Sequence, residues 1–519
     1  MNARGLSLLA LGAALAVVCV TCNAVTGLDE LDFDLDPAPP GAGGAGGAGG
    51  MGGAGGMGPT DVLWARPFGD IAEDYPSWLG FAADGDLVLA GAFTGTVDLG
   101  SGPIQSLDLG TDALVARFDP AGTPRFITPL DAGGGSDCVL DAVISPADQV
   151  IALVGSAPEG SFNSCVAANY WGEQSLGTYS NFLTHFSLRV IDTAGVAGPE
   201  IPICDGCAQN TLGPFALAQD GAGNIYLAGS ASGASTVLGQ PLTSTGLADV
   251  LVAKLDPAGA PIWIRRFGAV GGEAHATDIV VDGQGGVVVA GIFYGSLTLG
   301  MTTLTTAATD VFLTRLDAAG APVWSKGFVN AWSIAPPRLA LASDGILMAG
   351  DFHDTTSFGG DMLSTVGQDT IIPDGYLAKF TLAGDHVFSR RIADEPSPLQ
   401  LDQGGTGIAL TPQGNIVLVG AFGGSVVFDS VTLQANNGRD AFVALLDPAG
   451  SYLGHRQIRS TPGSRQADLL IALDGQGRAA VAGAFLGQID LGNGPLQSQG
   501  MNMYNDGFVA VYEGPAASP

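Results

Sequence analysis

The sequence predicts an all-β fold built from repeats, on three observations. Short apolar runs alternate with Gly-containing turns, long helical patterns are missing, and similar phrases return every ~60–70 residues. An apolar run followed by Gly marks each repeat, at Gly91, Gly155, Gly229, Gly291, Gly350, Gly420 and Gly483. Four short segments stand in each of these seven repeats. We therefore expect a seven-bladed β-propeller of four-stranded antiparallel blades.

The first two segments of a repeat are apolar and are joined by a tight turn. In the fourth repeat they are 279–281 and the run that ends at Gly291, with Asp282-Gly283 between them. Asp-Gly between apolar runs is typical of a hairpin, because Gly reaches positive φ without steric cost. The same dipeptide stands at Asp220-Gly221 and Asp474-Gly475.

The third segment alternates in polarity, as in 250–255, which favours a strand packed on one face. It ends in a turn in which Pro presets φ and Gly takes the left-handed conformation. These turns lie at 119–122, 256–259, 317–320 and 447–450. The fourth segment carries an aromatic or basic residue, at Trp64, Phe126, Trp263, Trp324, Phe388 and His455.

The repeats begin out of phase, and this predicts how the ring closes. Residues 62–66 read as a fourth segment with no first three before them, and residues 507–512 are a third segment with no fourth after them. We expect the N-terminal strand to complete the last blade, which would remove exposed sheet edges. The alternative is an open array with frayed ends.

The repeated phrases resemble the bacterial seven-bladed β-propeller repeat family (SBBP-type). They are clearest in ATDIVVDGQGGVVVAGIF at 276–293 and DVFLTRLDAAG at 310–320. The resemblance covers about 62–513, although an insertion at 157–180 and a longer connection at 368–373 depart from it. It implies the fold and an extracytoplasmic setting, and it implies no activity and no catalytic residues.

The composition and the N-terminus predict an exported protein. A net charge of −31 disfavours nucleic acid and anionic membrane surfaces as partners. Arg4 and the apolar run 6–20 indicate a signal peptide, residues 1–22, whose Cys22 resembles the lipidated residue of a lipoprotein box. Ordinary cleavage is the alternative. The expected location is the outer membrane or cell surface, or else the periplasm or the medium.

Further domain boundaries follow from composition. Residues 23–60 are acidic and then Gly-rich, which predicts a flexible linker, residues 61–513 form the propeller, and 514–519 are a tail. The propeller is expected to be a monomer that meets the membrane only through the lipid anchor.

Four cysteines remain after the signal peptide, all in or beside the second repeat. For an exported chain we expect disulfides, with Cys138–Cys165 and Cys204–Cys207 as the local pairing. A redox pair or a metal site at 204–207, and free thiols, are the other interpretations.

An Asp opens the third segment in six repeats. The residues are Asp112, Asp249, Asp310, Asp374, Asp440 and Asp506. Repetition in nearly every blade favours a structural role, in which a short carboxylate accepts backbone N–H groups. A ring of calcium sites is the alternative, although the flanking residues are poor in carboxylates.

The connections after the second and fourth segments are long and varied, so we expect binding at that end of the ring. Candidate residues of this binding face are Tyr75, Trp78, Asp131, Asp137, Tyr170, Trp171, Glu273 and Asp394. The predicted function is a non-catalytic scaffold that binds a protein or a glycan. No catalytic set, cofactor motif or metal-ligand spacing emerges, and the five histidines fall in different repeats.

The alternative function is a carbohydrate-active hydrolase or lyase that uses carboxylates in the central funnel. Paired acids suffice for glycoside chemistry when they lie ~5–10 Å apart. The first suspects are Asp131, Asp137 and Glu273.

Overall fold

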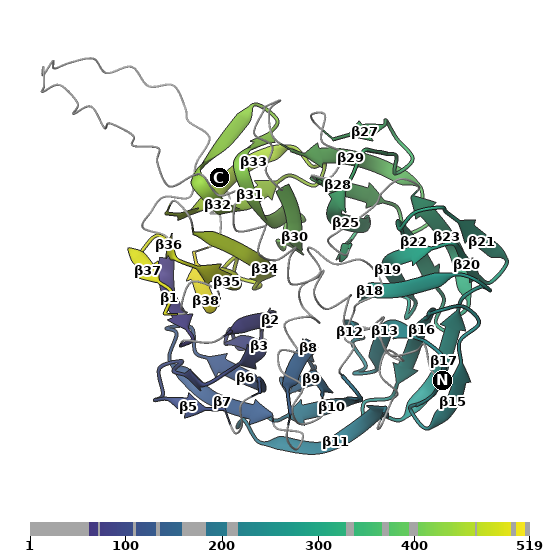
Figure 1. Ribbon diagram of the computed structural model, residues 1–519, viewed down its shortest axis with the longest axis horizontal. Helices are drawn as coiled ribbons and strands as arrows, with labels where there is room; N and C mark the ends of the chain where they lie inside the picture. The colour runs from purple at the N-terminus through teal and green to yellow at the C-terminus, as the bar shows by residue number, and fades with distance from the viewer. Residues whose placement is uncertain are drawn as a thin grey trace, which may run out of the picture. The chain divides into compact units, whose positions relative to one another are not determined.

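The computed structural model describes residues 62–70, 73–106, 110–130, 135–157, 183–204, 216–328, 337–365, 373–393, 403–461, 464–499 and 505–513. They belong to one compact unit, Ala54–Pro519, and a second unit, Met1–Gly53, lies outside the described residues. Every element in the described ranges is a β-strand. The predicted all-β class is therefore confirmed, in a β-propeller arrangement (Figure 1).

Six four-stranded antiparallel sheets occur in the described part of the chain. The first contains β2 (Tyr75–Phe81), β3 (Leu87–Phe93), β6 (Asp112–Phe118) and β7 (Pro124–Leu130). The second contains β8 (Asp137–Ile144), β9 (Val150–Ser156), β10 (His185–Ile191) and β11 (Ala197–Cys204). The third contains β12 (Ala216–Gln219), β13 (Ile225–Ala231), β16 (Asp249–Leu255) and β17 (Pro261–Phe267).

The remaining sheets follow in chain order. The fourth contains β18 (Glu273–Val281), β19 (Val287–Tyr294), β22 (Asp310–Leu316) and β23 (Pro322–Phe328). The fifth contains β24 (Arg338–Ala342), β25 (Gly345–Phe352), β28 (Asp374–Phe380) and β29 (His386–Ile392). A six-stranded sheet contains β30 (Gln403–Leu410), β31 (Ile416–Phe428), β32 (Val431–Leu446), β33 (Tyr452–Ser460), β36 (Gln488–Asp490) and β37 (Pro495–Gln497). The last four-stranded sheet contains β34 (Arg465–Leu473), β35 (Ala479–Leu486), β38 (Asp506–Tyr512) and β1 (Val62–Phe68).

The connections between second and third strands form small separate hairpins in four repeats, and a fifth hairpin, β36 with β37 between β35 and β38, joins the six-stranded sheet. The pairs are β4 (Thr96–Val97) with β5 (Ile104–Gln105), β14 (Ala234–Val237) with β15 (Gln240–Thr243), β20 (Ser296–Leu299) with β21 (Thr302–Thr305), and β26 (Thr355–Thr356) with β27 (Leu363–Ser364).

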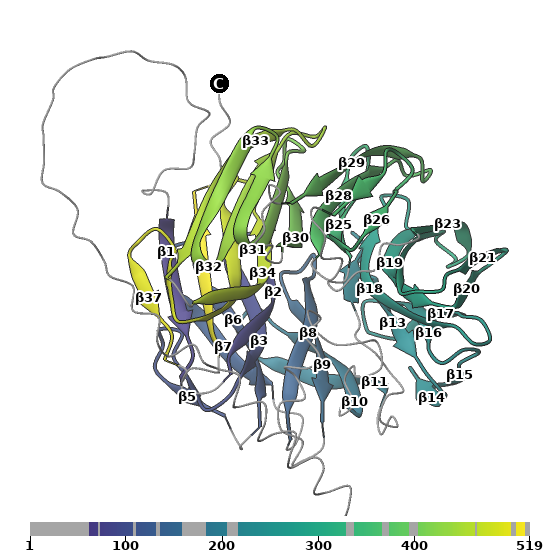
Figure 2. The ribbon, with the colours of Figure 1, turned by 45° about the horizontal axis from the view of Figure 1, so that its top comes forward.

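The first strand of each sheet lies nearest the axis of the ring, and we call these the inner strands (Figures 1 and 2). They are β2, β8, β12, β18, β24, β30 and β34. Neighbouring inner strands contact one another in this order, and β34 returns to contact β2. The second and third strands are the core, since β3, β6, β9, β13, β28 and β38 are buried along their whole length.

The N-terminal strand completes the last sheet, as the phase of the repeats predicts. β1 pairs antiparallel with β38, and Ala65 lies opposite Ala510. This pairing joins residues at the two ends of the repeat region and covers the edge that β38 would otherwise expose.

The Asp-Gly turns correct one prediction. We expected positive φ at the first Gly, but it occurs at the second Gly of the turn, as at Gly285 with φ 80° and Gly223 with φ 83°. Gly285 N donates to Asp282 O and Asp282 N donates to Gly286 O, so a four-residue turn ends in a left-handed residue. Gly221 and Gly283 have no such requirement, because nothing lies within 4 Å of an added Cβ and their φ is not positive.

Candidate functional site

The two ends of the ring differ in chemistry. The turns after first and third strands, such as 282–286 and 317–320, form what we call the tight-turn end. The hairpins and the connections between repeats form the long-connection end. At the tight-turn end the turn Asp accepts two backbone N–H groups, as Asp256 does from Ala258 and Ala260 at 2.9 Å each.

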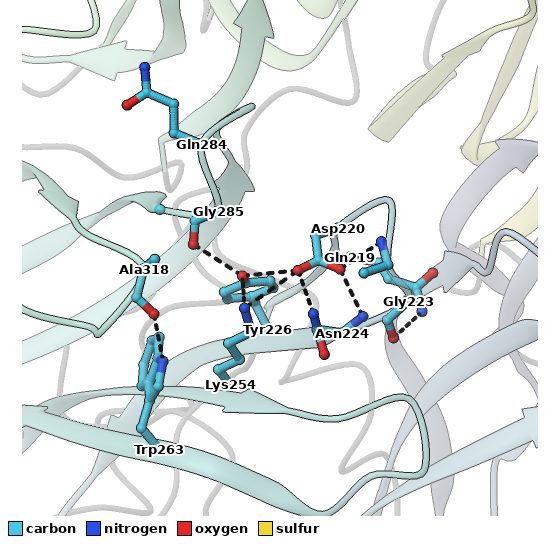
Figure 3. Close-up of polar contacts among 12 residues, drawn as sticks. Gln219, Asp220, Gly223, Asn224, Tyr226, Lys254, Trp263, Gln284, Gly285 and Ala318 are labelled. Atoms are coloured by element: carbon cyan, nitrogen blue, oxygen red, sulfur yellow. Dashed lines mark hydrogen bonds and ion pairs between the residues drawn. The ribbon is translucent and has the colours of Figure 1, made fainter.

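Side chains at the tight-turn end fasten one sheet to the next (Figure 3). Lys254 Nζ donates to Tyr226 Oη at 2.6 Å and lies 3.5 Å from Asp220 Oδ2. The Tyr226 hydroxyl reaches Gly285 O of the following sheet at 3.1 Å. Hydrogen bonds from Asn224 and the Lys254 charge lower the pKa of Asp220, although burial opposes them. The polar groups here are used in holding sheets together.

The pairing of Lys254 with Asp220 inside one sheet recurs around the ring. Arg315 contacts Asp282 at 2.6 Å, Lys379 contacts Asp344 at 2.9 Å, and Arg117 contacts Asp86 at 2.9 Å. In each case a third-strand cation meets a carboxylate from the first turn of the same sheet. This repetition indicates a structural role for the tight-turn end.

Fourth-strand aromatic residues add a second fastening. Trp263 Nε1 donates to Ala318 O at 3.1 Å, and Trp324 Nε1 donates to Leu382 O at 3.0 Å. Both acceptors lie in the third-strand turn of the next sheet. The turn glycines sit against these rings, so a Cβ on Gly384 would lie 2.9 Å from Trp324 Cδ2. The aromatic residues of the sequence pattern therefore serve contacts between sheets.

At the long-connection end the six repeat Asp residues are buried. Asp249 accepts N–H groups from Thr245 at 2.6 Å and Gly246 at 2.9 Å, and it also contacts Arg266 of the fourth strand. Asp440 accepts the backbone N–H of Ser460 at 2.8 Å and its hydroxyl at 2.7 Å. These bonds tie the connections to the strands, which favours the structural interpretation over calcium.

No group of three or more His, Cys, Asp or Glu side chains among the described residues is placed to hold a metal ion.

The structure brings three predicted binding residues to one end of the inner strands. Tyr75, Asp137 and Glu273 are the first residues of β2, β8 and β18, at the long-connection end. Tyr75 and Asp137 are buried, whereas the Glu273 side chain is 21% exposed. Trp78 lies further along β2 and is partly exposed. The other candidates, Asp131, Tyr170, Trp171 and Asp394, lie outside the described residues.

A hydrogen-bonded chain that the sequence reasoning missed lies beside Glu273. Ser230 Oγ is 2.8 Å from His275 Nδ1, and His275 Nε2 is 3.1 Å from Glu273 Oε1. Ser230 belongs to β13 and His275 to β18 of the next sheet. Only 1% of Ser230 is exposed, so its hydroxyl is not placed to attack a substrate. This series of hydrogen bonds joins two sheets and orients the Glu273 side chain.

Two inner-strand carboxylates were also missed. Asp141 Oδ2 accepts the N–H of Leu217 at 2.7 Å, and Asp278 Oδ2 accepts the N–H of Leu339 at 2.7 Å. Each therefore reaches the inner strand of the following sheet. Burial and the Asp278 charge raise the pKa of Asp141 to about 7, against the effect of its backbone hydrogen bonds. Burial also raises the pKa of Asp278, with Arg338 opposing it.

A signal for these two acids is present in the sequence. Both interrupt an apolar first segment four residues before the tight turn, as in Asp278 before 279–281. A register irregularity precedes each of them, between Val139 and Asp141 and between Ala276 and Asp278. Such bulges re-aim side chains, and a sequence pattern alone does not locate them.

The predicted disulfides stay predictions. Cys138 and Cys204 are buried, and Cys165 and Cys207 lie outside the described residues.

Within the described ranges, no helix is long and apolar enough to cross a membrane.

Comparison with known proteins yields distant likenesses. No model of a known protein family matches the chain. A "Regulatory protein FlaEY" of Caulobacter vibrioides is 28% identical over 223 residues, which are 40% of this chain and 22% of that protein. The chain thus spans about a fifth of the length of this relative.

Solved structures show distant resemblance. An ulvan lyase, described as a polysaccharide lyase, is 11% identical with a TM-score of 0.44, covering 80% of this chain and 93% of its own. The periplasmic gluconolactonase of Pseudomonas aeruginosa is 13% identical with a TM-score of 0.38, covering 82% of this chain and 100% of its own. No activity is assigned to this chain on the basis of these similarities.

Proposed function

We propose that the protein is a binding module that takes its ligand at the long-connection end of the inner strands. The observation that carries the proposal is the position of Glu273, whose partly exposed side chain lies at the same end of the inner strands as the buried Tyr75 and Asp137. Glu273 is the partly exposed member and is oriented by His275. A rigid scaffold that gathers side chains from several loops suits recognition.

The test is a binding array of envelope glycans and secreted proteins, read for both retention and turnover. We expect saturable binding without turnover, and weaker binding by Glu273→Ala. Asp256→Asn is the matched control, because it also removes one acidic charge but at the tight-turn end, where Asn is compatible with the turn. Equal binding by the wild type and Glu273→Ala would show that Glu273 does not contribute to the site. If the array retains no ligand at all, the protein is not a binding module of this kind.

A second candidate function is acid–base catalysis by Asp141 and Asp278. The observation that favours it is the pair of raised pKa values on Asp141 of β8 and Asp278 of β18, which interact electrostatically, since perturbed carboxylates of this kind are found at catalytic sites. Turnover in the same array that disappears in Asp141→Asn or Asp278→Asn, with the fold intact by circular dichroism, would favour catalysis over binding.

We also propose export with lipid attachment at Cys22, which the N-terminal sequence supports. Metabolic labelling with a palmitate analogue in a bacterial host should label the wild type and spare Cys22→Ala. Label that survives this substitution would exclude the anchor at Cys22.

For the architecture we propose seven blades. The six four-stranded sheets would each be one blade, and β30 to β33 of the six-stranded sheet would be another, with β36 and β37 as an added hairpin. An experimental structure that shows a different number of sheets around the axis would correct this count.

A further inference from the structure

One layer of the inner strands collects chemically distinct side chains. In each inner strand the fourth residue before the tight turn occupies an equivalent position, and these residues are Trp78, Asp141, Ala216, Asp278, Arg338, Gly407 and Leu470. We call them the inner layer. Trp78, Asp141, Asp278 and Arg338 are partly exposed, although the strands that follow them outward are buried.

The acids of the inner layer are held rather than mobile. Asp141 accepts N–H groups from Leu217 at 2.7 Å and Ala142 at 2.8 Å. Asp278 accepts N–H groups from Leu339 and Ile279 at 2.7 Å each. A carboxylate oxygen accepts more than one hydrogen bond, so acceptor capacity remains on both groups. Fixed polar groups of this kind lose little conformational entropy when a ligand binds.

The charges of the layer nearly balance. Asp141 and Asp278 interact electrostatically with each other and with Arg338, which lowers the pKa of both acids while burial raises it. The layer therefore combines acceptors, a guanidinium donor and an aromatic ring without a strong excess charge.

We propose, on the basis of the binding module proposed above, that the inner layer binds a neutral saccharide. Sugar hydroxyls both donate and accept, which matches the carboxylates of Asp141 and Asp278 and the guanidinium of Arg338. The apolar C–H face of a pyranose ring packs on an aromatic face such as that of Trp78.

Two other ligand classes fit less well. An anionic ligand would approach a chain of net charge −31 and meet Asp278. A metal ion needs several oxygen ligands, and no suitable group of His, Cys, Asp or Glu occurs among the described residues.

The experiment is isothermal titration of the full chain with neutral hexose, pentose and deoxyhexose oligosaccharides. We expect at least one probe to bind. Trp78→Ala and Arg338→Gln should each lower the affinity for that probe by about tenfold or more, which corresponds to about 1.4 kcal/mol of binding free energy. Trp324→Phe is the matched control, since it alters an aromatic residue of an outer strand. Circular dichroism and the unfolding temperature establish that each variant is folded.

The outcomes separate this inference from the proposed module. Loss of binding in both inner-layer variants, with Trp324→Phe unchanged, would support it. Saccharide binding that is insensitive to Trp78→Ala and Arg338→Gln would overturn it. Failure of every saccharide to bind would also overturn it, while retention of a protein in the array would leave the binding module standing.

Discussion

At the scale of single residues, the pKa values of two aspartates in this fold are shifted in opposite directions. Asp282 accepts two hydrogen bonds from Arg315, and although burial opposes them these bonds lower its pKa. Asp141 instead accepts the backbone N–H groups of Leu217 and Ala142, and burial raises its pKa to about 7. Position in the blade, rather than residue type, decides whether the charge stabilises the fold.

The raised pKa of Asp141 predicts a pH-dependent stability. The native state holds a proton that the unfolded chain releases near pH 4, so this contribution is complete below that pH and is lost as the pH rises to about 7. We expect Asp141→Asn to lack this loss, so its free energy of unfolding should improve relative to the wild type between pH 5 and pH 8. The upper limit is about 4 kcal/mol.

Urea unfolding at the two pH values measures this difference. Asp282→Asn serves as the control with the opposite sign. Because the pKa of Asp282 is lowered in the folded state, its ionised carboxylate stabilises the fold above pH 4, and this stabilisation is lost only in acid. An unchanged difference between Asp141→Asn and the wild type from pH 5 to pH 8 would show that Asp141 titrates normally.

The sequence indicated part of the candidate site at this scale. The loop-length pattern placed Tyr75 and Glu273 at one end of the ring, and the structure has them there. Ser230 was missed because its partner His275 lies 45 residues away in another sheet. Asp141 was missed because its bulge position depends on strand register.

At the scale of elements, turn chemistry predicts strand boundaries well. The Asp-Pro-Ala-Gly turns and their relatives end the third strands as expected, and their glycines have positive φ, as at Gly259 and Gly320. The hairpins inside the Thr-rich connections were not predicted, because strands of two to four residues carry too little alternation to be recognised.

The turn glycines should differ sharply in their tolerance of Ala. Gly384 has φ +88° and faces Trp324, so Gly384→Ala combines backbone strain with a clash and should destabilise by about 2–3 kcal/mol. Gly221 has open space around an added Cβ, so Gly221→Ala should lie within about 1 kcal/mol of the wild type. Chemical denaturation compares the two variants, and equal losses would contradict the geometry.

The repeat Asp residues should act as structural ties. Asp440→Ala leaves Ser460 N–H and the amide of Gln457 without their buried acceptor and should cost about 2–4 kcal/mol. The unfolding temperature of the wild type should not respond to calcium or to a chelator. A rise with calcium that is absent in Asp440→Ala would restore the calcium interpretation.

At the scale of the molecule, the order of segments in the repeats predicted the pairing of β1 with β38. The repeat region begins with a fourth segment and ends with a third segment, so the two strands together complete one repeat. Trp64 extends this link, since a Cβ on Gly122 of the first sheet would lie 2.6 Å from its ring. The closed ring fixes the positions of the inner strands, and these strands carry the residues of the proposed site.

The closure of the ring is therefore the central claim, and one truncation series tests it most directly. A chain that begins at residue 61 keeps β1, whereas a chain that begins at residue 70 lacks it. We predict that the first unfolds at the same temperature as the full chain and the second at a clearly lower one, because an entire strand ladder and its packing are lost. A synthetic peptide of residues 62–69 should restore the temperature when added to the shorter chain. Equal unfolding temperatures for the two truncations would contradict the closed ring.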